Sequence, residues 1–397
     1  MPPFVSEIFE GFLRFWLNPV FYIIVLLSFF LGMRRVKSER RLFHVRVGDV
    51  VTDVYHTLVP GLIYGLCLSV FFLGLGLVFP QGVIVLFVTI IFIISLAARP
   101  QWLTPVIPIP LAAVISFFLP AMDTGNLLIN NWLADIRTIT YTNYLLLLAS
   151  LLVVESFLLL FHAKRDPSPR RIQSKRGKQV GGFLINRLWL VPAFIVIPGA
   201  GLERLGWWPL FGDAASFSLL LVPFVIGCQQ LITYTTPERA VRQEGKRLFI
   251  YALVLFPIAI AAALYDWTAV ALTAIAVTLI VRMTLYALSK RNNRVRPFYF
   301  TEREDGLMIL DIIPATPAAS MNVKAGEIIR KVNGHDVRTP DQFYRALKAN
   351  AAFCKLEVLD EHGEVRFEQR ALYDDEHHEL GLLFVMDNDI ANKTNEK

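Results

Sequence analysis

Long apolar stretches separated by short polar segments make up most of the chain before residue 298. A helix that crosses the roughly 30 Å hydrocarbon core of a bilayer needs about 20 apolar residues, because it rises about 1.5 Å per residue. Repeated stretches of about this length predict eight to nine transmembrane helices. They are residues 17–33, 58–80, 82–98, 103–122, 143–162, 188–202, 215–233, 248–264 and 267–288, of which 188–202 is the shortest.

The pattern changes at residue 298 to short alternating segments that end in turn residues, which is typical of strands. The Asn-Gly pair at 333–334 predicts a tight hairpin turn, since both residue types tolerate positive φ. Thr339 and Gln342 have the spacing of a capping box, which predicts that a helix begins there. Phe343 and Leu347 then share one face of this helix at i and i+4.

These patterns predict three parts: a helical membrane domain over residues 1–297, an α+β domain over 298–385 and a polar tail over 386–397. Composition agrees, because 55% of the residues are hydrophobic and only 18% are charged, which is too apolar for a water-soluble fold of this length. With the N-terminus outside, 23 Lys and Arg residues lie on the cytosolic side and three outside. Cytosolic loops carry such an excess, so we expect the α+β domain in the cytosol.

The first part has a net charge of +13 and the α+β domain one of −6. The positive charge indicates anionic membrane lipids as partners. The sequence lacks the interleaved aromatic and basic residues that would indicate nucleic-acid binding. Residues 47–58 form an amphipathic stripe that either lies on the inner leaflet or simply leads into the second span. The basic segment 164–178 reads as a flexible loop.

Two features inside the predicted spans point to helix packing and to buried charge. Gly61 and Gly65 form a GxxxG pair, which predicts that a second helix packs closely there. Glu155 is an acidic residue well inside a span, and its depth matches that of Arg282, so we expect an intramembrane ion pair. A neutral or water-facing Glu155, or a proton or ion pathway, remains open.

The α+β domain resembles the bacterial PDZ fold. The resemblance rests on the segments PATPA (314–318), AGEII (325–329) and VNG (332–334), with Ala315 and Asn322 where that fold usually has glycine. The resemblance implies that the segment 380–383 receives the C-terminal carboxylate of a partner, while side chains of the helix line the peptide groove. The residues implied are Leu380, Gly381, Leu382, Leu383, Phe343 and Leu347. A PDZ-like fold used only for packing is the alternative.

Catalytic patterns are missing from the sequence. No HExxH or GxSxG motif occurs, and the segment after His378 and Glu379 lacks a second histidine at zinc-binding spacing. The three cysteines lie far apart in different predicted elements, so they form no disulfide framework and no metal site. We expect a protein that is not an enzyme and uses no metal or cofactor.

The chain as a whole also resembles the MinJ family, the polytopic PDZ proteins of the Min division-site system of Gram-positive rods. The segments RRVKSER (34–40), AAFCKLEVLD (351–360) and HHELGLLFV (377–385) carry this resemblance. It implies an adaptor at septa and poles that links DivIVA to MinD, and so to MinC. A regulator or partner of a membrane protease and a small-solute transporter are the alternatives, and homo-oligomerisation stays open.

Overall fold

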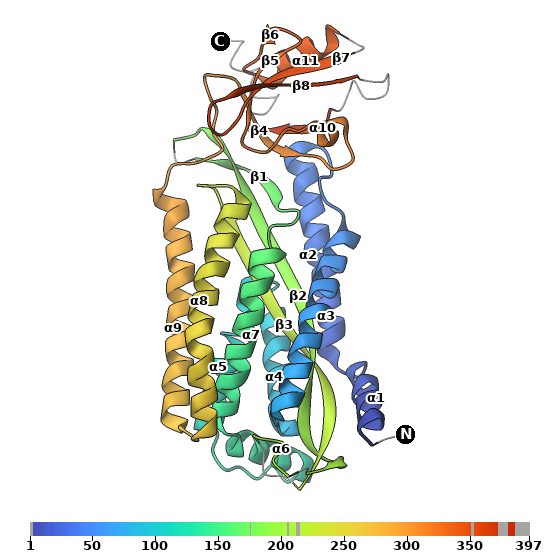
Figure 1. Cartoon of the computed structure of the whole chain (residues 1–397), viewed down its shortest axis with the longest axis vertical. Coiled ribbons are helices and arrows are strands. Elements are labelled where there is room, and N and C mark those ends of the chain that lie inside the picture. Colours follow the sequence, from blue (N-terminus) through green and yellow to red (C-terminus); the bar gives the residue numbers. More distant parts are fainter. Residues whose placement is uncertain are drawn as a thin grey trace.

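The computed structural model describes residues 3–174, 176–204, 206–211, 215–350, 353–371 and 380–385. A long bundle of helices surrounds a narrow antiparallel sheet, and a small α+β domain lies at one end of the bundle (Figure 1). The predicted tail 386–397 and the histidines at 377 and 378 lie outside the described residues.

Five described helices are long and apolar enough to cross a membrane. They are α2 (Pro19–Phe43), α3 (Val50–Leu75), α7 (Tyr141–Phe161), α8 (Pro237–Leu264) and α9 (Thr268–Val295). Two of the other predicted spans are shorter apolar helices, α4 (Gln81–Ser95) and α5 (Pro108–Phe118), the second preceded by the 3-10 turn η1 (Pro100–Trp102). Helices α1 (Pro3–Phe15) and α6 (Leu127–Thr138) lie at the end of the bundle away from the α+β domain (Figure 1).

The prediction of helices at 188–202 and 215–233 is wrong. Both stretches are strands, β2 (Gln179–Glu203) and β3 (Ser216–Ile232), which pair antiparallel into one long hairpin. The hairpin runs along the helices, and its tip lies at the end that is remote from the α+β domain (Figure 1). Because the two strands run out and back, they leave the predicted sidedness of the flanking segments unchanged.

Side chains of neighbouring helices form hydrogen bonds with backbone N–H groups of this hairpin. Lipid hydrocarbon could not supply such hydrogen bonds. Ser69 Oγ accepts a hydrogen bond from the N–H of Phe194 at 2.9 Å, and Glu7 Oε2 accepts one from the N–H of Leu219 at 3.1 Å. Pro192 and Pro223 face each other in the register and have no N–H to satisfy. The strands are therefore sheltered by protein along their length.

The GxxxG pair contacts this hairpin and not a second helix, which corrects that prediction. A Cβ on Gly61 would lie 1.8 Å from the carbonyl oxygen of Leu190, and one on Gly65 would lie 2.1 Å from that of Pro192. Glycine is required at both positions because helix α3 approaches the backbone of β2 directly.

The structure also decides two segments that were predicted to be cytosolic. The basic segment 164–178 is not a simple loop, because β1 (Ser168–Gln173) within it pairs with β2 in the order β1-β2-β3. The amphipathic stripe at 47–58 belongs largely to α3, so it leads directly into a span, which was one of the two interpretations of the sequence.

The α+β domain consists of a six-stranded sheet and two helices. Its described strands are β4 (Leu307–Ile312), β5 (Ile328–Val332), β6 (His335–Asp336), β7 (Phe353–Leu359), β8 (Val365–Ala371) and β9 (Leu382–Phe384). They follow the order β8-β7-β5-β4-β9, with β6 paired to β5, and the helices are α10 (Pro317–Ser320) and α11 (Pro340–Lys348). The predicted capping box of Thr339 and Gln342 begins α11, and Asn333 and Gly334 both have positive φ in the predicted turn.

Candidate functional site

Strand β9 and helix α11 hold the residues that the sequence assigned to a peptide groove. Leu380, Leu382, Phe343 and Leu347 lie in one apolar cluster, and the Phe343 ring lies 5.0 Å from that of Phe384. Leu380, Phe343 and Leu347 have no exposed surface, and Leu382 is 4% exposed. In this conformation the side chains of the domain itself fill the space between β9 and α11.

Leu383 points to the opposite face of the sheet, so it is not part of that cluster. It packs with Val385 and Phe300 of the α+β domain and with Phe43 and Phe183 of the membrane domain. This apolar junction docks the sheet onto the C-terminal end of α2 and the N-terminal part of β2 (Figure 1). The outward-facing residues of β9 therefore hold the two domains together.

Hydrogen bonds extend the junction. The N–H of Gly181 donates to the carbonyl of Phe300 at 2.8 Å, and the N–H of Tyr299 donates to the carbonyl of Thr233 at 2.9 Å. Arg171 of β1 donates to the carbonyls of Leu42 at 3.1 Å and Phe384 at 3.4 Å. Arg171 thus connects α2, β1 and β9.

Gly381 lies beside Thr316 at the start of β9. Its φ is +89°, and a Cβ there would lie 2.0 Å from Thr316 Oγ1. The N–H of Ile313 donates to the carbonyl of Gly381 at 2.8 Å. The loop that would receive a carboxylate in a PDZ domain is therefore closely packed on this side.

A buried charge network lies beneath the junction, and the sequence analysis missed it. Arg35 on α2 is bound to Glu39 at 2.8 Å and to Asp53 of α3 at 2.9 Å, and Arg187 of β2 reaches Asp53 at 3.0 Å. Ser168 of β1 donates to Glu39 at 2.8 Å. The i,i+4 spacing of Arg35 and Glu39 was the available signal, but these residues were counted only as topological charge.

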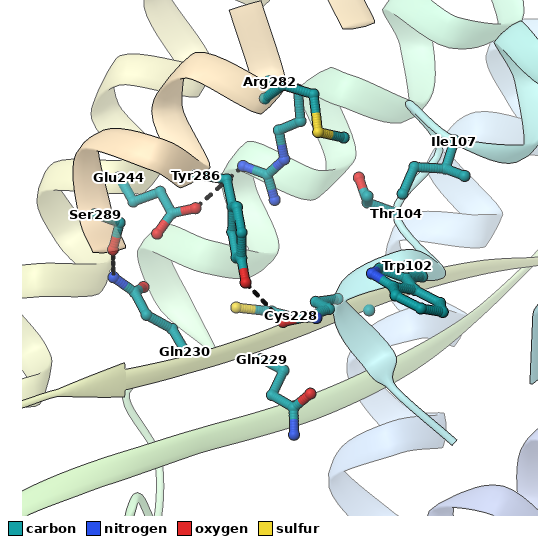
Figure 2. A pocket seen from close by; sticks show the side chains of 13 residues that line it. Trp102, Thr104, Ile107, Cys228, Gln229, Gln230, Glu244, Arg282, Tyr286 and Ser289 are labelled. Atoms are coloured by element: carbon teal, nitrogen blue, oxygen red, sulfur yellow. Dashed lines mark hydrogen bonds and ion pairs between the residues drawn. The ribbon is translucent and has the colours of Figure 1, made fainter. Parts of the chain in front are cut away.

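Glu155 and Arg282 are brought together inside the membrane domain. Arg282 Nη2 lies 2.6 Å from Glu155 Oε1, and Thr104 donates to Glu155 Oε2 at 2.9 Å. Glu244 of α8 adds a second carboxylate at 3.1 Å from Arg282 Nη1, which the sequence analysis did not foresee (Figure 2). Cys228 lines the same cavity of about 110 Å³. The guanidinium joins α7, α8 and α9, so the cluster can stabilise their packing.

Metal-ligating side chains do not gather in the part of the chain that the structure describes. Within it, no group of three or more His, Cys, Asp or Glu side chains is arranged to hold a metal ion. The described cysteines Cys67, Cys228 and Cys354 are free.

Comparison with known proteins decides the family. The chain is 36% identical over 375 residues to the cell division topological determinant MinJ of Bacillus subtilis strain 168. The aligned residues cover 94% of each chain. The chain belongs to the MinJ family. A probable MinJ of Lacticaseibacillus paracasei is 23% identical over 228 residues, which cover 54% of this chain and 58% of that one. No family model and no solved structure matches the chain.

Membership of the MinJ family places the described sites in a cell-division protein of the membrane. Arg35, Glu39 and Asp53 support the end of the bundle on which the α+β domain docks, while Glu155 and Arg282 lie deeper in it. The C-terminal domain therefore packs against one end of the membrane part.

Proposed function

We propose that this chain is a membrane scaffold in division-site selection, which binds a DivIVA-like protein at septa and poles and a MinD-like ATPase, and through it a MinC-like inhibitor. The observation that carries the proposal is the 36% identity over 94% of the chain to a curated division determinant. The action proposed is binding without catalysis, since the sequence contains no HExxH or GxSxG pattern.

The C-terminal domain is proposed to be PDZ-like and cytosolic, and to contact the partner. The positive-inside distribution of Lys and Arg supports its sidedness. Its outer strand β8 supports a role in binding, because Phe367 is 61% exposed and Val365 is 46% exposed there. A peptide between β9 and α11 would first have to displace Phe343 from Phe384.

Live-cell imaging tests this proposal. The full chain, fused to a fluorescent protein, is compared with a version that lacks residues 298–397 in cells where MinD and division sites are also marked. We expect the full chain at septa and poles, with MinD dispersed when the chain is absent. The variant Phe367→Ser should weaken MinD recruitment, whereas Arg345→Ser on α11, also exposed, should not.

A uniform distribution of the full chain, together with MinD positions that ignore it, would refute the scaffold proposal. If the truncated chain still recruits MinD, the membrane domain and not the α+β domain makes that contact. Regulation of a membrane protease would then be examined through the proteins that co-purify with the full chain.

A further inference from the structure

A cavity of about 510 Å³ opens near the cytosolic end of the membrane domain. The residues that line it come from α2, the turn that follows α4, the segment before β1, and strands β1, β2 and β3. Figure 1 shows β1 and the end of α2 beside the α+β domain. Its volume falls within the range of about 300 to 1,000 Å³ that is usual for small-molecule sites. The charged and amide side chains that line it are those of Arg34, Arg35, Arg99, Asp166, Arg170, Asn186 and Gln229.

The cavity has an excess of positive charge. Among the described residues, Arg34, Arg99 and Arg170 form no ion pair, whereas Arg35 is neutralised by Glu39 and Asp53. The acidic lining residue, Asp166, is itself 3.3 Å from His56 and 4.0 Å from Arg187. An anion is therefore the ligand that the cavity suits by charge.

Arg170 supplies the clearest sign that a ligand binds here. Its Nε atom is buried and has no hydrogen-bond partner among the described residues, and neither has Asn186 Oδ1. Burial, together with the nearby Arg35, lowers the pKa of Arg170 despite the neighbouring Glu39. A guanidinium presents several donors in one plane, which match the oxygens of a phosphate.

The outer rim of the cavity is apolar. The Arg34 guanidinium lies over the Phe30 ring at 5.4 Å, and Phe30 is 45% exposed. Leu96, next to the turn that carries Arg99, is 70% exposed. The Arg99 guanidinium lies over the Trp102 ring, 5.3 Å from its centroid. Exposed apolar side chains beside arginine and tryptophan are typical of the headgroup level of a bilayer. A free ion would leave this rim without a partner, whereas acyl chains would cover it.

We propose that this cavity binds a phosphate group, and that the phosphate belongs to the headgroup of an anionic phospholipid of the cytosolic leaflet. Arg170 and Arg99 contact the phosphate from β1 and from the turn after α4, Arg34 closes the site from α2, and the acyl chains lie along Phe30 and Leu96. The site does not depend on the scaffold function proposed above.

Lipid retention by the purified full-length chain tests the site. Native mass spectrometry counts the phosphatidylglycerol or phosphatidylcholine molecules that remain bound after each is added to delipidated protein in detergent. The wild type should retain phosphatidylglycerol in preference to phosphatidylcholine. The variant Arg34→Gln/Arg99→Gln/Arg170→Gln should bind phosphatidylglycerol about tenfold more weakly or worse, because each lost contact is a charge-assisted hydrogen bond.

The matched control is Arg40→Gln/Arg41→Gln/Arg247→Gln, which removes the same charge from exposed positions outside the cavity. Equal losses in both triple variants, or no preference of the wild type for phosphatidylglycerol, would overturn the proposal. If the triple variant unfolds in a thermal melt, Arg34→Gln/Arg99→Gln replaces it, because both of these side chains are exposed.

Competition with inorganic phosphate distinguishes a free phosphate ion from a phospholipid headgroup as the ligand. If inorganic phosphate displaces phosphatidylglycerol from the wild type at a concentration comparable to that of the lipid, the ligand is free phosphate and the lipid assignment is refuted. If phosphatidylglycerol stays bound at a large excess of phosphate, the apolar rim contributes to binding and the assignment holds.

Discussion

The two sheets of the molecule differ in how their unpaired backbone groups are covered. In the membrane domain, Ser69 and Glu7 satisfy backbone N–H groups of β2 and β3, and Gly61 and Gly65 bring α3 against the β2 carbonyls. In the α+β domain, β8 ends the described sheet with an alternating pattern of exposed and half-buried side chains. A backbone group that lacks a partner costs much more in hydrocarbon than in water, so only the first sheet needs a cover made of protein.

The same contrast applies to charge. Glu155 has no exposed surface and its partner Arg282 is 11% exposed, whereas Arg239 at the start of α8 and Glu361 of the α+β domain, which lie 2.6 Å apart, are 56% and 44% exposed. Water can solvate a partner left behind in the second pair but not in the first. The predictions below test this contrast from the largest expected effect to the smallest.

Removing one guanidinium should separate the two regions most clearly. Arg282→Leu leaves the buried Glu155 and the half-buried Glu244 without an ion partner, and we expect it to lower the free energy of unfolding by about 3 to 5 kcal/mol. Arg239→Leu should cost about 1 kcal/mol or less, because its partner Glu361 reaches water. Thermal unfolding of the purified chain in detergent measures both.

A triple variant sharpens that result. Glu155→Leu/Glu244→Leu/Arg282→Leu removes every charge of the cluster and should recover most of the stability that Arg282→Leu loses. Equal stability of Arg282→Leu and wild type would contradict the burial of this ion pair.

Helix α3 offers a test of the glycine contact with β2. In Gly65→Leu the new side chain meets the Pro192 carbonyl, so we expect a loss of about 3 kcal/mol. Gly74→Leu in the same helix is the control, because a Cβ there has no atom within 4 Å. Similar melting temperatures for the two variants would show that the close approach is absent.

The junction between the domains should respond to pH through Asp311. Burial raises the pKa of Asp311 from 3.8 to about 7. The folded state therefore prefers the protonated acid. The stability that protonated Asp311 contributes is fully present below about pH 4 and is lost as the pH rises to about 7. Above that pH the free energy of unfolding no longer changes through this group. Asp311→Asn should stabilise the chain by about 2 kcal/mol at pH 8 and little at pH 4.

Thermal unfolding of wild type and Asp311→Asn in buffers from pH 4 to pH 8 measures this dependence. Asp360→Asn is the control, because Asp360 accepts backbone hydrogen bonds in an exposed turn that hold its pKa below the usual value. A constant difference between wild type and Asp311→Asn over the whole range would contradict a raised pKa.

Ala315 should give the smallest effect. Its φ is +60°, at the position where the bacterial PDZ pattern usually has glycine, whereas Asn322 is not among the residues with positive φ. Ala315→Gly should stabilise the α+β domain by about 0.5 to 1 kcal/mol, since a left-handed conformation disfavours a Cβ. Denaturant unfolding of the full chain, followed by the fluorescence of a probe in the α+β domain, measures the gain.

Much of this fold follows from sequence periodicity, but the hairpin does not. Five long spans, the helix that begins at Thr339 and the turn at Asn333 lie where the sequence predicts them. Strands β2 and β3 were read as helices because a strand buried on both faces has the same unbroken apolar run as a transmembrane helix. The short stretch at 188–202 and the prolines at 192 and 223 were the signals against helices.

The sites were predictable where the chemistry is local. The depth of Glu155 and Arg282 was enough to place them together, but Glu244 precedes the predicted span 248–264, and its part in the cluster was not predicted. The groove residues were assigned from a motif, which gives their position on β9 and α11 but not that they are buried. Burial depends on packing between distant segments, which no local pattern records.

The membrane hairpin also constrains how the chain is made. Neither strand is stable alone in lipid, because its backbone groups find partners only in the other strand and in the covering helices. During synthesis α3 is complete before β2, so Gly61 and Gly65 gain their contacts with Leu190 and Pro192 only after β2 has been made. Because an unpaired strand is unstable in hydrocarbon, we expect β2 and β3 to enter the membrane part as a pair.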